Sequence, residues 1–238
     1  MCTLTWETLP SGYELHFNRD ESRSREKAAP PSIEVKGDTS VICPRDQQAG
    51  GTWISVNEYG VGLCILNNYL AAQQYFGVVS RGLLVDDLAS AKDSQEIATL
   101  MSDLDYKKYS PFDLFIFSPE GEVKRYSWDG NKYQALQPTE KFMSSSGFDT
   151  RAVIAERRQL YIEHQTNDLF DARKFHKSRD PERSAYSVCM SRPDAKTLSY
   201  SNIRVDQDRC TFIYTDGSPC NTDPLDPLAL DRKYAESH

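Results

Sequence analysis

The chain has 238 residues, of which 39% are hydrophobic and 26% are charged, and its formal net charge is −7. This composition supports one packed core, while the acidic balance excludes the dense cationic surface that DNA or RNA binding needs. No apolar run approaches the roughly 20 residues that cross a bilayer, and the amino terminus lacks a secretion signal, so we expect a cytoplasmic protein without a transmembrane segment.

Alternating apolar and polar residues predict a β-hairpin at the start of the chain, with strands over 2–7 and 13–17. Residues 19–32 are charged and then rich in proline, which predicts a long loop, and residues 33–43 resume extended character. A second hairpin is predicted over 52–57 and 61–66, and the nearly continuous apolar run of its second strand indicates deep burial.

The middle of the chain carries helical periodicity. Ser80 can cap a helix that continues to Ala91, and a second helix is predicted over 94–104. Three strands follow at 112–117, 123–128 and 133–136, then a helix at 149–164 and a shorter one beginning at Asp168. The last predicted strands are 186–190, 198–205 and 210–215.

Antiparallel hairpins at both ends of the chain, with helices in two blocks between them, predict an α+β fold with two stacked antiparallel sheets covered by helices. We expect one domain over 1–217 and a C-terminal tail over 218–238, where proline and aspartate are frequent. The six cysteines form no C-x-x-C pair, so most of them are expected to be buried thiols.

Cys2 is the first candidate for chemistry. Removal of Met1 would make it the N-terminal residue, and its α-amine, with an ordinary pKa of about 7.7–8.0, would then lie beside the thiol. One residue would supply both nucleophile and base. The alternative is that Cys2 is simply a small residue at the start of a strand.

The tetrad Asn18-Arg19-Asp20-Glu21 stands at the end of the second predicted strand. The hairpin would bring Arg19 and Asp20 next to Cys2, where the arginine would lower the thiol pKa and the carboxylate would hold or orient the amine. A solvated turn is the competing interpretation of such a charged run.

Several motifs together resemble the NRDE family, which is named for this tetrad and includes transport and Golgi organisation protein 2. They are Met1-Cys2, the tetrad, Gly50-Gly51-Thr52-Trp53, and Asn57 with Gly60 leading to Asn67-Asn68-Tyr69. The similarity runs from Met1 to Thr215. It implies the four-layer αββα sandwich of the N-terminal nucleophile hydrolases, of the choloylglycine hydrolase and penicillin acylase type.

The resemblance also implies roles for single residues. The stretch from Asn57 to Asn67 is similar to the N-E-x-G…L-N segment of those hydrolases, which implies that Asn67 helps to bind the oxyanion. Ser145 stands where they have a further asparagine, and only Arg183 and Arg192 are candidates for their late active-site arginine. The residues expected to contact a substrate are Asn18, Trp53, Asn57, Asn68 and Ser145.

A retired enzyme fold that serves as an interaction scaffold is the weakest of three possible functions, and two stronger ones remain open. One is a cysteine amidohydrolase for a small, non-peptide amide, with Cys2, Arg19, Asp20 and Asn67 as the catalytic residues and no cofactor. The other is a binding protein, because the NRDE family is linked to haem trafficking and lipid homeostasis; Cys2 or His16 would then be the candidate iron ligands. The histidines are too dispersed to predict any other metal site.

Overall fold

The computed structural model describes residues 2–166 and 170–235. Met1, Asp168 and His238 lie outside the described residues. Within these ranges the strands form two antiparallel sheets, here called the first sheet and the second sheet.

The first sheet has the strand order β10-β1-β2-β11-β12-β13. Its strands, in chain order, are β1 (Cys2–Leu9), β2 (Gly12–Ser22), β10 (Phe142–Ser145), β11 (Ala195–Val205), β12 (Arg209–Thr215) and β13 (Leu228–Asp231). The N-terminal hairpin is therefore confirmed, and both of its strands are longer than predicted. The NRDE tetrad lies inside β2 and continues its pleat.

The second sheet has the strand order β3-β4-β5-β6-β7-β8-β9. Its strands are β3 (Ala29–Lys36), β4 (Thr39–Arg45), β5 (Ile54–Asn57), β6 (Gly62–Asn67), β7 (Phe112–Phe117), β8 (Val123–Trp128) and β9 (Tyr133–Leu136). Neighbours in this sheet are also neighbours in sequence, so it is a simple meander.

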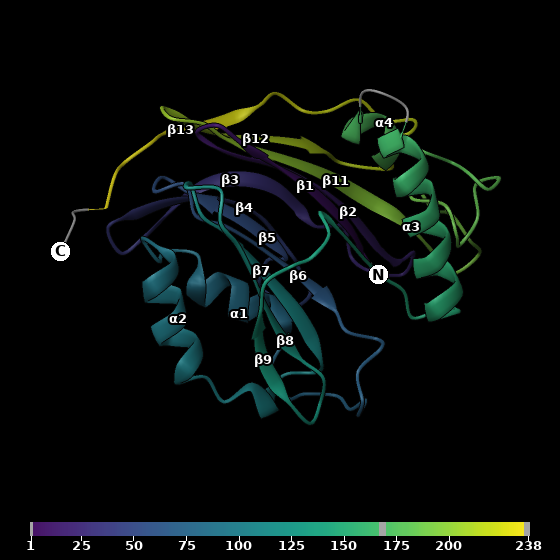
Figure 1. Cartoon of the computed structure of the whole chain (residues 1–238), viewed down its shortest axis with the longest axis horizontal. Helices are drawn as coiled ribbons and strands as arrows, with labels where there is room; N and C mark the ends of the chain where they lie inside the picture. The colour runs from purple at the N-terminus through teal and green to yellow at the C-terminus, as the bar shows by residue number, and fades with distance from the viewer. Residues whose placement is uncertain (1, 167–169, 236–238) are drawn as a thin grey trace.

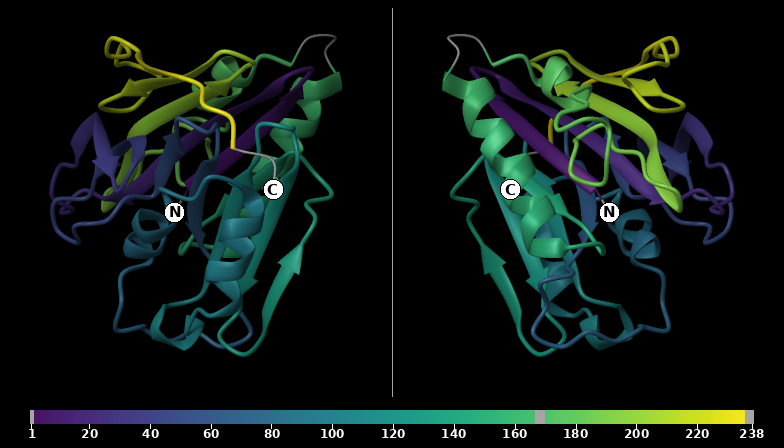
Figure 2. Two further views of the ribbon diagram at one scale, coloured as in Figure 1. Left: turned by 90° about the vertical axis from the view of Figure 1, so that its left-hand side faces the viewer. Right: turned by 90° about the vertical axis from the view of Figure 1, so that its right-hand side faces the viewer.

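Helices cover the outer face of each sheet (Figure 1). They are α1 (Arg81–Leu88) and α2 (Ser94–Ser102) on the second sheet, α3 (Thr150–Thr166) and α4 (Ala172–His176) on the first, and a short 3-10 turn at Tyr106–Lys108. The side views in Figure 2 show the same succession of layers. The predicted α+β fold with two stacked antiparallel sheets is confirmed.

The core lies between the two sheets, and the hairpin β1–β2 shows how the sequence directs this. Alternate residues of β1 point to opposite faces. Leu4 and Trp6 belong to the main hydrophobic core, and Trp6 packs against Phe115 of β7 with ring centroids 5.6 Å apart. Thr3 and Thr5 lie on the other face, under α3 and α4.

Two segments differ from the sequence predictions. The predicted loop over 19–32 is largely strand, because β2 extends to Ser22 and β3 begins at Ala29. Pro30 and Pro31 fit in β3 because it is an edge strand, whose outer side needs no N–H donors. No strand forms over 186–190, where the backbone N–H of Met190 donates instead to the Thr197 hydroxyl at 3.0 Å.

The C-terminal region contributes more structure than its composition suggests. Strand β13 lies within the expected tail and pairs with β12. Cys220, from the same region, is joined to Cys189 by a disulfide, whereas Cys2, Cys43, Cys64 and Cys210 are buried thiols. In the described part of the chain, none of the helices combines the length and the apolar character needed to span a membrane.

Candidate functional site

A cleft of about 350 Å³ opens where β1 begins, β2 and β6 end, and α1 starts. The four residues that the sequence predicts as catalytic all line it: Cys2, Arg19, Asp20 and Asn67. They come from three strands of two different sheets. Residues far apart in the chain therefore converge on one cleft.

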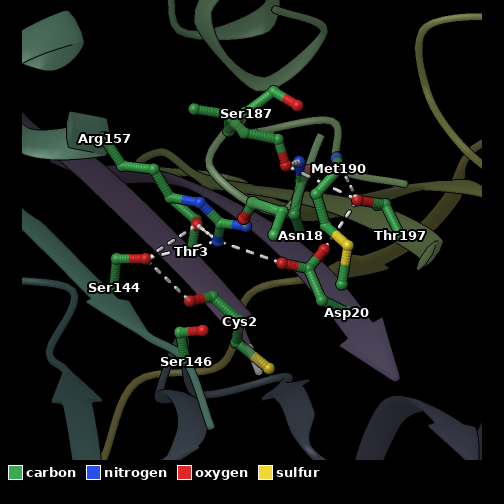
Figure 3. A network of polar contacts seen from close by, with 12 residues as sticks. Cys2, Thr3, Asn18, Asp20, Ser144, Ser146, Arg157, Ser187, Met190 and Thr197 are labelled. Atoms are coloured by element: carbon green, nitrogen blue, oxygen red, sulfur yellow. Dashed lines mark hydrogen bonds and ion pairs between the residues drawn. The ribbon is translucent and has the colours of Figure 1, made fainter. Parts of the chain in front are cut away.

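Cys2 is placed by strand pairing. It lies opposite Arg19 of β2 and, on its other side, opposite Ser145 of β10. Its side chain is 8% exposed and its sulfur points away from the polar contacts behind the strand (Figure 3). Burial raises the pKa of the thiol above its ordinary value of 9.0 and outweighs the lowering effect of Arg19. The thiol is therefore protonated near neutral pH and needs a base to become a nucleophile.

Arg19 is held rigidly beside Cys2. Its Nη2 donates to Oδ2 of Asp46 at 2.8 Å, and its guanidinium carbon lies 4.1 Å above the centre of the Trp53 ring. Arg25 binds the same carboxylate oxygen at 2.9 Å. Two guanidinium groups therefore share one carboxylate at this side of the cleft, which leaves an excess of positive charge there.

Asp20 lies at the edge of the cleft, but its carboxylate points to the opposite face of β2. There it accepts hydrogen bonds from Arg157 Nη1 at 3.0 Å and from the Thr197 hydroxyl at 2.6 Å. The Asp20–Arg157 ion pair has no exposed side-chain surface. Burial raises the pKa of Asp20 even though Arg157 opposes this shift.

Arg157 connects Asp20 to the backbone of Cys2 (Figure 3). The same Nη1 atom that binds Asp20 lies 2.8 Å from Thr3 Oγ1 and 3.3 Å from Ser144 Oγ. The Ser144 hydroxyl in turn donates to the carbonyl oxygen of Cys2 at 3.3 Å. These contacts fix the start of β1 between β2 and β10.

Arg157 is a residue of the site that sequence reasoning missed. The two expected arginines are elsewhere: Arg183 donates to Ser218 at 2.9 Å, and Arg192 lies over the ring of Phe148. The signal for Arg157 is its position, four residues after Val153 on the buried face of α3. A charged residue in an apolar helical stripe needs a buried partner.

Asn67 lines the cleft from β6, whereas Ser145 lies beside Cys2 on β10 and does not line the cleft. Asn67 ends β6, and its Nδ2 donates one hydrogen to the Tyr69 hydroxyl at 2.8 Å, so its second amide hydrogen is available to a ligand. Ser145 is buried opposite Cys2, and its hydroxyl has no partner within residues 2–166 and 170–235.

Asn18 and Asn57, predicted to contact a substrate, have a different role. Asn18 is fully buried under α4, where its Nδ2 donates to the carbonyl oxygens of His176 and Val188. Asn57 is also fully buried, and its Nδ2 donates to the carbonyls of Ala89 and Ala91. Both amides satisfy backbone groups, so they stabilise the frame around the cleft and do not line it.

Asn68 caps the turn after β6, because its Oδ1 accepts the backbone N–H of Leu70 at 3.1 Å, and it does not line the cleft. Trp53 does line it. It also belongs to the main core, with 7% of its surface exposed.

The glycines of Gly50-Gly51-Thr52-Trp53 allow α1 to approach the cleft. A Cβ atom on Gly51 would lie 2.3 Å from the backbone of Gly82, which only a glycine permits. The Thr52 N–H donates to the Gly82 carbonyl at 3.0 Å. This close contact brings the first turn of α1, including Arg81, to the cleft wall.

A haem bound by both Cys2 and His16 does not fit this arrangement. His16 shares the buried outer face of β2 with Asn18, where its Nδ1 lies 2.7 Å from the Tyr200 hydroxyl and its ring stacks on His176. Cys2 faces the cleft on the other side of the sheet. Among the described residues there is also no group of three or more His, Cys, Asp or Glu side chains that could hold a metal ion.

The chain is similar in fold to several solved structures of N-terminal nucleophile hydrolases. A variant of the conjugated bile acid hydrolase from Clostridium perfringens has a TM-score of 0.63 at 10% identity and covers 100% of this chain and 98% of its own. Penicillin V acylase from Agrobacterium tumefaciens has a TM-score of 0.55 at 11% identity, over 91% and 83%. The Caenorhabditis elegans ortholog of N-acylethanolamine-hydrolyzing acid amidase has 0.54 at 10%, over 85% and 92%.

At these identities the likeness establishes the fold alone, which is the predicted sandwich of the N-terminal nucleophile hydrolases. No curated protein matches the chain in sequence. The family model described as Transport and Golgi organisation 2 matches residues 1–205, in agreement with the NRDE tetrad and its neighbouring motifs. The chain therefore belongs to the Transport and Golgi organisation 2 family, with the fold of the N-terminal nucleophile hydrolases.

Proposed function

We propose that this protein is a cysteine amidohydrolase that acts on the C–N bond of a small, linear amide. The observation that carries the proposal is the convergence of Cys2, Arg19 and Asn67 on one cleft. A thiol at the second position, a fixed cation beside it and an amide donor across the cleft are the groups that acyl transfer requires. Solved structures of the same fold bear the names acylase, hydrolase and amidase.

The reaction would begin once Met1 is removed and the α-amine of Cys2 is free. The amine takes the thiol proton, and the sulfur attacks the amide carbonyl carbon. The developing oxyanion accepts a hydrogen bond from the free amide N–H of Asn67, and Arg19 stabilises the negative charge. The α-ammonium then gives its proton to the departing amine, and water hydrolyses the thioester to regenerate the thiol.

Trapping the acyl intermediate tests the proposal. Purified protein is first checked by intact mass for loss of Met1, then mixed with a series of acyl-4-nitroanilides of increasing chain length. We expect release of 4-nitroaniline and an acyl adduct on Cys2, because the thioester forms before water attacks. Cys2→Ala should lose both signals.

Cys43→Ala is the matched control, because Cys43 is also a buried thiol but lies outside the cleft. It should react like the wild type. Retention of Met1 would contradict the proposal, because Cys2 would then lack a free α-amine. Release of 4-nitroaniline that persists in Cys2→Ala would also contradict it, because turnover would then not require the Cys2 thiol.

Haem or lipid binding in the same cleft is the second candidate, and the thiol facing the cleft is what supports it. His16 is on the wrong face of the sheet, so an iron would depend on Cys2 alone. The charged groups that line the cleft, including Arg19, Glu21 and Asp46, favour a polar ligand over a large apolar one.

A haem titration followed by visible absorption separates this candidate from the enzyme. If haem binds through Cys2, the Soret band of the bound form should shift in the wild type and not in Cys2→Ala. We expect no such shift in either protein. A shift that disappears with Cys2→Ala would favour the carrier.

A further inference from the structure

Arg81 is a cation in the Cys2 cleft without an acidic partner. It is the first residue of α1, and its Nη1 donates to the carbonyl oxygen of Pro111 at 2.9 Å. No carboxylate in residues 2–166 or 170–235 forms an ion pair with it. The other two arginines of the cleft, Arg19 and Arg25, both bind Asp46.

The charges of the cleft wall favour an anion. Arg157 neutralises Asp20 from the opposite face of the sheet. Three guanidinium groups therefore remain against two carboxylates, those of Asp46 and Glu21. The surplus positive charge lies in a cleft that is partly shielded from solvent, where electrostatic attraction is stronger than in open water.

The indole nitrogen of Trp53 is a further polar group in this region without a partner among the described residues. The Trp53 side chain is 7% exposed and lines the same cleft. The indole nitrogen can only donate. An unsatisfied buried donor is rare in folded proteins, because leaving it without a partner destabilises the fold.

Burial also acts on Arg81 itself. Desolvation lowers the pKa of its guanidinium, because burial is unfavourable for the charged form. An oxyanion beside Arg81 would relieve that cost, since a guanidinium binds carboxylate or phosphate oxygens through paired N–H groups.

We propose that Arg81 forms an oxyanion-binding subsite in the Cys2 cleft. A ligand of this cleft then carries a carboxylate or phosphate group. The extension to substrates, that the amide cleaved by Cys2 belongs to an anionic molecule, rests on the proposed hydrolase function. Binding of the anion does not.

The alkylation of Cys2 by a charged and a neutral reagent tests the subsite. In both reactions the Cys2 sulfur displaces iodide from carbon and the thiol proton goes to solvent, but iodoacetate carries a carboxylate and iodoacetamide does not. Peptide mass spectrometry gives the rate at Cys2 separately from the other thiols. Any change in thiolate fraction affects both reagents equally, so it cancels in the ratio of the two rates.

The iodoacetate-to-iodoacetamide ratio at Cys2 should fall about tenfold in Arg81→Gln, because a charge-assisted contact is lost for one reagent only. Arg81→Lys keeps the charge and should retain part of the preference. Arg209→Gln is the matched control, an exposed arginine paired with Asp231 far along the first sheet. It should keep the wild-type ratio, and an unchanged ratio in Arg81→Gln overturns the subsite.

A second readout applies if Cys2 reacts with neither reagent. Sodium acetate and sodium phosphate at matched ionic strength should raise the Tm of the wild type, because a ligand that binds the folded state stabilises it. The more effective salt identifies the preferred oxyanion. Arg81→Gln should lose this rise, and an equal rise, or none in the wild type, overturns the proposal. Loss of amidase activity with an intact anion response would reject the hydrolase function alone.

Discussion

Replacing Arg157 with leucine should lower the free energy of unfolding by about 3–5 kcal/mol, because removing one partner leaves the other charge buried without its counterion. Arg157 and Asp20 have no exposed side-chain surface and are 3.0 Å apart. The substitution also removes the donor to Thr3 and Ser144 beside the start of β1. Equilibrium unfolding in urea measures the change.

Arg158→Leu is the matched control on the same helix. Arg158 is paired with Glu140 at the surface, where its side chain is 51% exposed. An exposed pair contributes about 0–1 kcal/mol, so this variant should unfold close to the wild type. Similar small losses in both variants would contradict the role assigned to Arg157.

The double variant Asp20→Leu/Arg157→Leu separates the two charges. It removes both members of the pair, so it should destabilise the protein by less than the sum of the two single substitutions. Strict additivity would show that the two groups act independently. Such a result would contradict an energetic coupling between Asp20 and Arg157 of α3.

The fold could be predicted where local patterns and tertiary contacts agree. The strands β7, β8 and β9 have the predicted bounds, because each is a compact apolar or alternating run bounded by turn residues. Strands β10 and β13 were not predictable in this way, since each has only four residues. Strand β10 forms by pairing with β1, which is distant in sequence, and β13 pairs with β12 across a long irregular segment.

Part of the candidate site could also be predicted from the sequence. Short motifs identified Cys2, Arg19 and Asn67, and the fold brings them to one cleft. Sequence alone does not distinguish an asparagine that binds a ligand from one that satisfies backbone carbonyls, which is how Asn18 and Asn57 came to be expected at the substrate. Arg81 belongs to none of these motifs. Its importance follows from the lack of an ion pair with any carboxylate of the described residues, which only the fold reveals.

The two faces of β2 give neighbouring residues of the tetrad different surroundings. Arg19 points into the cleft, whereas its neighbours Asn18 and Asp20 point toward α4 and α3. Adjacent residues of a strand face opposite sides, so a four-residue motif can bind two layers at once. The buried polar groups that tie β2 to these helices fix the position of the cleft residues on its other face.

Acid should destabilise this protein as the pH falls below about 6.5, because two buried histidines are neutral in the folded state. Burial lowers the pKa of His16 from 6.5 to about 4, with Arg173 adding to this effect and Glu14 opposing it. Burial lowers the pKa of His176, and the positive charge of a protonated His16 would lower it further. Between pH 6.5 and 4 the unfolded chain binds a proton that folded His16 does not, so stability decreases as pH decreases.

The loss in free energy of unfolding that His16 causes is about 1.4 kcal/mol per pH unit, or about 2 kcal/mol between pH 6.5 and 5. Asp20 acts in the opposite direction, since its raised pKa favours the folded state as pH falls. Comparing each variant with the wild type cancels this contribution. Urea unfolding at pH 7.5 and 5.0 should therefore show a smaller loss of stability in His16→Gln, and also in His176→Gln, than in the wild type.

His164→Gln is the control for this experiment. His164 lies near the end of α3 with its ring against Phe175 and is not buried in the polar layer under α4. Its replacement leaves the buried pair of His16 and His176 in place, so the contribution of that pair should persist. If His16→Gln and His176→Gln kept the full wild-type slope, the proton uptake of the unfolded state would have to come from other groups, and the neutral, buried histidine pair would not be the cause.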